Sequence, residues 1–312
     1  MLKYIGKRIL LMIPVILGVS FIIFAIMNLT PGDPALIILG EAATPEAREE
    51  LREAMGLNDN FFIRYGRYVL HAVQGDFGNS YRTKLPVLDE VFTRFPNTFT
   101  LAFWGMTLAV GIGLPVGVIS AVKQYSLVDN LSLAIALLMT SIPAFWLGLI
   151  LVLTFALNLQ LLPAIGADTW KNFVLPCITL AIGTMAILIR MTRSTMLEVI
   201  RQDYIRTAKA KGASTKRVIF KHALRNAMLP VITIIGINFG FQLGGAMIIE
   251  TVFSIPGLGS LMITSVRAKD TPTVMASVLL VAILAGLINL LVDIFYVYID
   301  PRIKSQYVKA RR

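Results

Sequence analysis

The sequence predicts an all-α membrane protein with six transmembrane helices, a helical extracytoplasmic segment after the first helix, and both termini in the cytoplasm. Two observations predict this class. Of the 312 residues, 56% are hydrophobic and only 15% are charged, whereas a soluble domain carries about 25% charged residues. Six apolar runs are also long enough to cross a bilayer core, which takes about 20 residues per helix.

The first apolar run follows Lys3, Lys7 and Arg8 and could be mistaken for a signal peptide. It is longer than the apolar core of a signal peptide, and residues 28–33 offer no small-x-small cleavage site, so we expect a retained helix. The six predicted spans are Ile9–Met27, Thr98–Val122, Leu131–Leu157, Phe173–Met191, Met228–Phe253 and Val274–Ile299.

The distribution of basic residues predicts the orientation. Ten of the 29 lysines and arginines lie between Arg190 and Arg225, and short loops rich in these residues stay in the cytoplasm. The chain then divides into an N-terminus with the first span (1–27), an extracytoplasmic segment (28–97), and a membrane core (98–312) that includes a cytoplasmic loop at about 193–227.

The extracytoplasmic segment is too polar to span and reads as a small helical cap. Thr44, Pro45 and Glu46 predict the start of one helix, which Gly56 ends. This cap is either a packed domain without a ligand or a docking surface. Five residues at helical spacing mark one face of a second helix that ends near Gly75: Phe61, Tyr65, Tyr68, Val69 and Ala72.

Glycines recur every four residues in two of the spans. Gly236, Gly240 and Gly244 form one stripe in the fifth span, and Gly113 and Gly117 form another in the second. Such stripes let a second helix approach closely. Packing within the chain and packing against another subunit both remain open.

The cytoplasmic loop is polar, basic and periodic. Apolar residues between Ser194 and Lys211 have helical spacing, and Gly212 interrupts them. Ser214 then caps a second short helix that runs through Lys221 or Leu224. The two helices form a rigid protrusion whose basic side chains suit carboxylates on a partner protein. Contact with anionic lipid headgroups is the alternative.

The amino-acid sequence of this loop resembles the EAA loop of binding-protein-dependent ABC importer permeases. Asp203–Gly212 reads Asp-Tyr-Ile-Arg-Thr-Ala-Lys-Ala-Lys-Gly, and His222–Ala227 reads His-Ala-Leu-Arg-Asn-Ala. Only Ala208 matches the Glu-Ala-Ala triplet, and Leu229-Pro230 lies further downstream than in the sugar branch. These departures resemble the peptide/nickel branch of the family.

The resemblance extends over the whole chain, and the order of its short segments makes it specific. It identifies the chain as similar to the first of the two permease subunits of a dipeptide/oligopeptide-type importer. The other matching segments are Pro31–Pro34, Gly75–Gly78, Ser141–Gly148, Met191–Glu198, Glu250–Gly259 and Asp300–Arg302.

This resemblance implies a set of partners in a bacterial or archaeal plasma membrane. They are a second homologous permease, two ATP-binding subunits and an extracytoplasmic solute-binding protein. Ser254, Pro256, Gly257 and Gly259 would face the binding protein. The residues implied to couple to the ATPase are Asp203, Tyr204, Arg206, Ala208, Gly212, Ala213, Ser214, Arg217, His222 and Arg225.

We expect no catalysis and no cofactor in this chain, with ATP and magnesium bound by the partner ATPases. The sequence lacks the Gly-x-x-x-x-Gly-Lys-Ser/Thr loop that holds nucleotide phosphates. We also expect no metal site. His71 and His222 lie on opposite sides of the predicted membrane, and Cys177 is the single cysteine.

Two acidic residues are candidates for the translocation path, because an acid inside a membrane usually faces a partner or water. Glu250 is either a gate, a contact for a peptide amino group, or an anchor for the loop that follows it. Asp293 lies within the sixth span. A proton-coupled carrier is a competing function, but it needs a titratable path and an internal repeat. Nickel, glutathione and other small solutes are alternatives to peptides.

Overall fold

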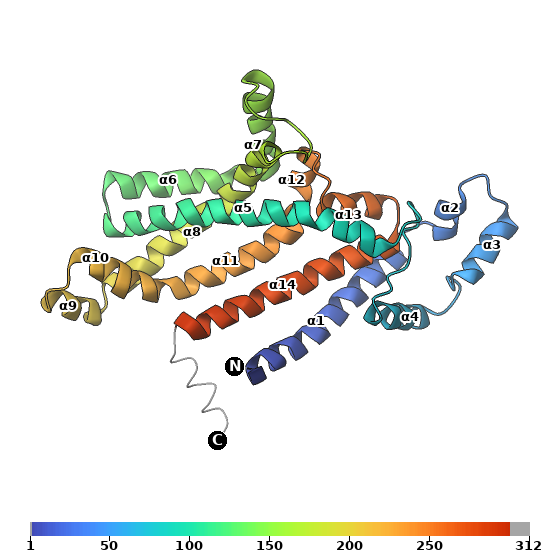
Figure 1. Ribbon diagram of the computed structural model, residues 1–312, viewed down its shortest axis with the longest axis horizontal. Helices are drawn as coiled ribbons and strands as arrows, with labels where there is room; N and C mark the ends of the chain where they lie inside the picture. The colour runs from blue at the N-terminus through green and yellow to red at the C-terminus, as the bar shows by residue number, and fades with distance from the viewer. Residues whose placement is uncertain (1, 300–312) are drawn as a thin grey trace. The chain divides into compact units, whose positions relative to one another are not determined.

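The computed structural model describes residues 2–299, and helices dominate them (Figure 1). The Asp300–Arg302 segment and the C-terminal tail lie outside the described residues. Two compact units divide the chain: residues 2–98 with 256–286, and residues 99–255 with 287–299. Helices α5 (Val87–Val122) and α14 (Thr271–Ile299) contribute to both units.

The first unit contains the first span and the extracytoplasmic helices. They are α1 (Leu2–Leu29), α2 (Pro34–Leu39), α3 (Pro45–Ala54) and α4 (Phe61–Val73). The predicted start of α3 is confirmed, because the Thr44 hydroxyl accepts a hydrogen bond from the Ala47 amide at 3.2 Å. Helix α2 was not predicted. Asp33 caps it through the Ala35 amide, and Pro34 occupies its first position.

The predicted aromatic face of α4 is also confirmed. Phe61 and Tyr65 pack edge-on against Phe21 of α1, with ring centroids 5.7 and 5.2 Å apart, and Tyr68 stacks on Phe24 at 6.0 Å. The Tyr65 hydroxyl also donates to the Leu17 carbonyl at 3.0 Å. Helix α4 therefore lies directly against the transmembrane helix α1.

The loop before α14 is held by one buried carboxylate. Asp270 is fully buried and accepts hydrogen bonds from the Ser80 hydroxyl, the Tyr81 amide (2.9 Å) and the Thr273 hydroxyl (2.9 Å). Helix α13 (Leu258–Arg267), which the sequence analysis did not predict, precedes this loop. Its first amide donates to the Thr98 hydroxyl at 2.7 Å. The start of α5 and the residues around α13 are thus tied together.

The second unit is a bundle of α5, α6 (Leu127–Ser141), α8 (Lys171–Ile200) and α11 (Arg225–Gly245). Small residues bring α5 and α8 together. A Cβ on Gly113 would lie 3.0 Å from the Met185 carbonyl oxygen, and one on Gly117 would lie 2.7 Å from the Thr192 Cβ. Of the two alternatives for this glycine pair, the structure shows packing within the chain.

Gly236 has a similar role in α11. A Cβ there would lie 2.2 Å from a methyl group of Val292 on α14, so this glycine also serves packing within the chain. Gly240 and Gly244 are half-buried, and their predicted role in helix packing stays a prediction.

The third span is not the continuous helix that the sequence predicted. Helix α6 ends at Ser141, and α7 (Ala144–Leu151) leaves it at an angle of 97°, followed by a π-helical turn at Val152–Asn158. The cause is Pro143, which lacks an amide hydrogen and disfavours the helical conformation of the residue before it. Ile142 is accordingly extended, with ψ of 122°.

Among the described residues, five helices are long and apolar enough to cross a membrane, and the bent α6–α7 pair counts as a sixth span only if it crosses as one broken helix. Several spans differ in their ends from the prediction. Helix α5 begins at Val87, inside the segment predicted to be extracytoplasmic, and α8 continues to Ile200. The fifth span divides into α11 and the short helix α12 (Met247–Val252).

Candidate functional site

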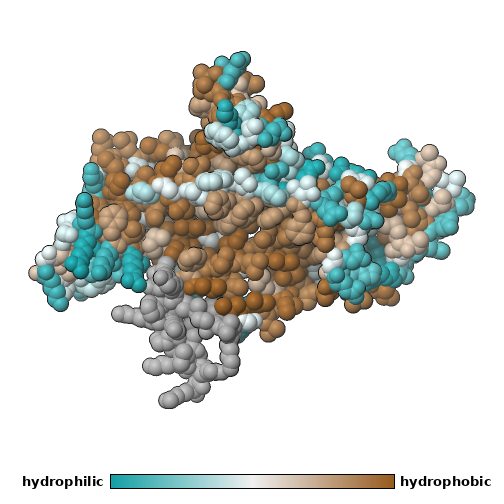
Figure 2. Space-filling model, viewed as in Figure 1, coloured by the Kyte–Doolittle hydropathy of each residue, from teal (hydrophilic) through white to brown (hydrophobic). Residues whose placement is uncertain are grey.

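The predicted cytoplasmic loop begins with a short helix, α9 (Asp203–Ala210). Asp203 lies in its first turn and Lys209 in its last, so both charges complement the helix dipole. Asp203, Tyr204, Arg206 and Lys209 are exposed. Figure 2 shows hydrophilic side chains gathered around α9 and α10, in contrast to the hydrophobic surface over α6.

A single apolar side chain fastens α9 to the bundle. Ile205 is completely buried in a cluster with Val118 and Ala121 of α5, Met196 of α8, and Val218. The transfer of an isoleucine side chain out of water contributes about 1.5–3 kcal/mol. Helix α9 is therefore packed on two helices of the bundle. The rigidity expected of this loop stays a prediction.

Gly212 ends α9 in the way the sequence predicted. The Ala213 amide donates to the Ala208 carbonyl at 3.1 Å and the Gly212 amide donates to the Lys209 carbonyl at 3.0 Å, which together form a Schellman cap. Gly212 has φ of +79°, and a Cβ added to it would meet no atom within 4 Å. Backbone conformation, and not close approach of a neighbour, is what requires glycine here.

The second helix of the loop begins where it was predicted but does not end there. Ser214 caps it by accepting a hydrogen bond from the Arg217 amide at 3.4 Å. Helix α10 (Thr215–Arg217) then passes into a π-helical segment (Val218–Leu224) and directly into α11. The protrusion is thus α9 together with the end of one long helix that enters the membrane bundle.

The predicted coupling residues differ in exposure. Gly212, Ser214, Arg217 and Arg225 are exposed, as are the three α9 residues Asp203, Tyr204 and Arg206, whereas Ala208, Ala213 and His222 are half-buried. The Arg206 guanidinium lies 3.9 Å from the Asp203 carboxylate, but both side chains are more than three-quarters exposed, so this ion pair contributes little. Both charges remain available to a partner.

Two further contacts were missed by the sequence analysis. The Asn226 amide nitrogen donates to the Tyr204 hydroxyl at 3.1 Å and to the His222 carbonyl at 2.8 Å. It thereby joins α9 to the start of α11. Asn226 lies inside the quoted segment His222–Ala227, but sequence spacing carried no sign of this partner.

A buried ion pair holds the cytoplasmic end of the bundle. The Arg193 guanidinium donates to both carboxylate oxygens of Asp129, at 2.6 and 2.8 Å, and the Tyr125 amide donates to the same carboxylate at 2.9 Å. Asp129 is fully buried. Because Arg193 precedes the end of α8 by two turns, the pair fixes the turn between α5 and α6 against the helix that leads into α9.

The two acids predicted for the translocation path occupy different environments. The Glu250 side chain is completely buried in α12. The backbone carbonyl of Glu250 accepts a hydrogen bond from the Ile255 amide at 2.8 Å. That backbone bond anchors the following loop. Asp293 is half-buried in α14. Their roles in a path stay predictions.

The loop after α12 presents only part of its predicted docking surface. Ser254 and Pro256 are exposed, whereas Gly257 and Gly259 are buried. Ser254 adopts a left-handed conformation with φ of +49°. Within the first unit, the Asn97 amide donates to the Pro256 carbonyl at 2.9 Å. Contact of Ser254 and Pro256 with a binding protein stays a prediction.

A cavity of about 450 Å³ lies between α6, α7, α8 and α11. None of the described residues that line it is charged. Its polar groups include Thr140, Thr184, Asn238 and Gln242. The Gln242 amide nitrogen donates to the Thr184 hydroxyl at 3.0 Å, while its carbonyl oxygen is buried and has no partner among the described residues. Such an acceptor is costly to leave unpaired.

Two family models and several known proteins match this chain. Residues 113–305 match the family described as binding-protein-dependent transport system inner membrane component, and residues 1–102 match its N-terminal counterpart. The chain is 43% identical to the dipeptide transport system permease protein DppB of Alkalihalophilus pseudofirmus, covering 97% of this chain and all of the relative.

One further relative and one solved structure are also similar to this chain. The glutathione transport system permease protein GsiC of Escherichia coli (strain K12) is 42% identical over 97% of this chain and 99% of its own length. An inward-facing structure of the MetNI methionine ABC transporter superposes with a TM-score of 0.57 at 22% identity. The match covers 68% of this chain and 97% of the transporter chain. Because the identity is only 22%, this similarity bears on the fold alone.

Proposed function

The chain belongs to the family of binding-protein-dependent transport system inner membrane components, and from that premise we propose that it imports short peptides. It is the permease subunit of an ATP-driven ABC importer in the inner membrane. Membership in this family implies ATPase subunits and a solute-binding protein as partners. A second homologous permease and two ATPase subunits would complete the assembly, and this chain would form half of the path.

The observation that carries the choice of solute is the full-length identity to a dipeptide permease. The chemistry of the cavity agrees with it. Asn238 and Gln242 carry amides, and Thr184 carries a hydroxyl, so the cavity offers donors and acceptors without charge. These groups can form hydrogen bonds with peptide bonds, which all short peptides share whatever side chains they carry.

The proposed coupling runs along one continuous helix. Ser214 caps its cytoplasmic end, and Gln242 lies in the cavity about 28 residues later, which is about 42 Å of helix. Helix α9 would sit in a groove of an ATPase subunit, with Asp203, Arg206 and Arg217 as its charged contacts. ATP binding to the partner then biases two packings of the spans, which gives alternating access.

The test is uptake by proteoliposomes that contain the complete transporter with its binding protein. We expect ATP-dependent accumulation of a labelled dipeptide, unaffected by dissipation of the proton gradient. We expect Gln242→Leu to lower the rate of transport about tenfold or more with assembly intact, because a buried hydrogen-bonding partner is lost. Ile237→Leu, on the same helix but outside the lining of the cavity, is the matched control and retains transport.

Import that required the proton gradient but continued without ATP would overturn the proposal in favour of a secondary carrier. Wild-type rates in Gln242→Leu would remove the cavity from the path and leave the importer assignment standing.

Glutathione is the second candidate solute, because GsiC is almost as similar to this chain as DppB. Glutathione carries two carboxylates and a thiol, whereas a dipeptide carries one terminal carboxylate. Competition decides between the two. An excess of unlabelled glutathione that abolishes dipeptide uptake would favour glutathione, and an excess of other dipeptides that does so would favour peptides.

A further inference from the structure

Helix α4 has three faces of different chemistry, and one of them is apolar and open. Its aromatic face packs on α1, as described above. A second face carries Arg64, Arg67 and His71. With 3.6 residues per turn, the remaining apolar side chains fall in one arc of about 120°. Phe62, Ile63, Leu70 and Val73 of this arc are 70%, 58%, 59% and 81% exposed.

The contacts of α4 place it beside the outer part of the first span. Tyr65 reaches the Leu17 carbonyl, and Tyr68 stacks on Phe24. At 1.5 Å per residue, these positions lie about 18 and 8 Å along α1 from Leu29, the outer end of the helix. The hydrocarbon core of a bilayer is about 30 Å thick. One leaflet contributes about half of that thickness, about 15 Å, so the contacts of α4 with α1 extend from near the outer surface to about the middle of the bilayer.

The surface of α1 at this depth is also apolar and exposed. Ile22 is 57% exposed, Ile26 52% and Leu29 80%. Since α1 is a membrane span, exposed apolar side chains at this depth suit acyl chains. The aromatic face of α4 packs on the same stretch of α1, which leaves the open apolar face of α4 exposed beside an equally apolar span.

The basic side chains of α4 reach toward the outer end of α1. The Arg64 guanidinium donates to the Asn28 side chain at 2.8 Å and lies over the Phe24 ring. The Arg67 guanidinium pairs with Asp59 at 2.7 Å. Long basic side chains commonly cover apolar surface while their charge stays at the membrane surface.

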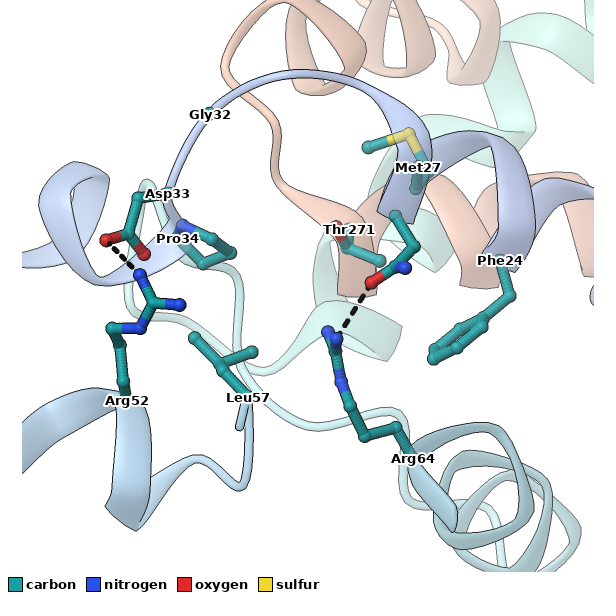
Figure 3. Close-up of a pocket in the computed structure, with 10 residues that line it drawn as sticks. Phe24, Met27, Gly32, Asp33, Pro34, Arg52, Leu57, Arg64 and Thr271 are labelled. Atoms are coloured by element: carbon teal, nitrogen blue, oxygen red, sulfur yellow. Dashed lines mark hydrogen bonds and ion pairs between the residues drawn. The ribbon is translucent and has the colours of Figure 1, made fainter. Parts of the chain in front are cut away.

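A basic pocket of about 190 Å³ lies at that outer end (Figure 3). Arg52 and Arg64 point into it, and Asp33 neutralises Arg52 through an ion pair of 3.2 Å. Arg64 donates to a neutral amide and forms no ion pair with an acidic side chain among the described residues, and Lys269 lies against Gly32 of the pocket wall. The pocket thus carries positive charge at the level of lipid phosphates.

We propose that α4 is embedded in the outer leaflet as an interfacial amphipathic helix, with phospholipid as the partner of its open apolar face. A helix of this kind lies in the plane of the interface, with its apolar side in the acyl region and its basic residues at the headgroups. The extracytoplasmic segment is then anchored to the bilayer along α4, and is not only a cap above it. This inference does not depend on which solute is transported.

Depth-dependent quenching tests the proposal in the assembled transporter. On a Cys177→Ala background, a bimane label is placed at Val73→Cys or Leu70→Cys on the open face. Ile22→Cys on α1 is the lipid-facing reference, and Glu50→Cys on α3 is the aqueous reference. The proteoliposomes contain phosphatidylglycerol with brominated acyl chains, and iodide is the aqueous quencher.

We expect the labels at Val73 and Leu70 to follow the Ile22 label, with bromolipid quenching several times stronger than iodide quenching. Labels that follow Glu50 would place the face in water and overturn the proposal. Labels that neither agent quenches would show that protein covers the face, and that result would also overturn it. Two label sites keep the test decisive if one variant fails to assemble.

Discussion

At the scale of single residues, Gly212 shows most directly how one backbone angle shapes the coupling loop. Its φ of +79° lies in the left-handed region, and the space around it is open. A β-branched residue there costs about 1–2 kcal/mol of strain, whereas asparagine tolerates this conformation. We therefore expect Gly212→Val to lower substrate-stimulated ATP hydrolysis by the complete transporter severalfold, and Gly212→Asn to retain most of it.

The comparison isolates conformation from size, because a Cβ at this position meets no atom within 4 Å. Equal activity of the two variants would show that the turn does not need a left-handed residue. Assembly is checked by co-purification of the ATPase subunits.

The Asp129–Arg193 pair is the second feature at this scale. Removing one partner leaves a charge with little access to water, which costs about 3–5 kcal/mol, while replacing both by apolar residues of similar size often costs little. We expect Asp129→Leu to lower the thermal unfolding temperature of the purified transporter strongly. The double variant Asp129→Leu with Arg193→Met should recover most of the loss.

A double variant as unstable as the single one would mean that the carboxylate matters through Ser120 and Tyr125, and not through Arg193. The hydrogen bonds from those two residues to Asp129 make that outcome measurable.

At the scale of elements, the contact between α5 and α8 depends on the absence of side chains. A Cβ at Gly117 would lie 2.8 Å from the Ile189 carbonyl oxygen as well as against Thr192. We expect Gly117→Val to destabilise the bundle by about 1–3 kcal/mol through overpacking. The measurement is the thermal unfolding midpoint of the purified transporter.

Gly18→Val on α1 is the control for this prediction. Gly18 is also a helical glycine in a span, but nothing lies within 4 Å of its Cβ position. An equal loss of stability in both variants would assign the effect to helix propensity instead of packing.

At the scale of the whole molecule, the bent pair α6–α7 decides the number of membrane crossings. If the pair crosses, the loop before α8 lies outside, and both described ends of the chain lie on the cytoplasmic side. We expect Asp168→Cys, on the Cys177→Ala background, to react with an impermeant maleimide in intact cells. Lys209→Cys on α9 should react only after permeabilisation.

Glu50→Cys on α3 is the positive control for external reaction. Reaction of Asp168→Cys only after permeabilisation would show that α6–α7 is re-entrant, with five crossings in the chain.

Much of the fold could be predicted because its signals are local. Long apolar runs revealed the spans, and the caps at Thr44 and Ser214 and the break at Gly212 depend on neighbouring residues. The bend at Pro143 was missed because the apolar composition continues through it. Helix α13 was missed because its loop was interpreted from Gly and Pro alone.

The candidate site divides in the same way. Tyr204, Arg206 and Gly212 were predicted because the sequence of the loop resembles a known one. The structure places them on α9 and at its C-terminal cap. The roles of Ile205, Asn226 and the Asp129–Arg193 pair were not predicted, because their partners are distant in the sequence. Asn226 and Tyr204 are 22 residues apart, and Arg193 and Asp129 are 64 residues apart. The cavity around Gln242 was missed because neutral amides in an apolar run carry no sequence signal.

The sequence by itself determined the class and the family of this protein and predicted its orientation, because hydropathy, basic residues and short motifs are properties of neighbouring residues. Only the tertiary structure decided which glycines serve packing within the chain, that the second loop helix continues into the bundle, and which face of α4 is open. These features depend on contacts between side chains that are distant in the sequence. The hydrophobic effect is non-directional, so it favours the burial of an apolar face but does not select the neighbour that covers it.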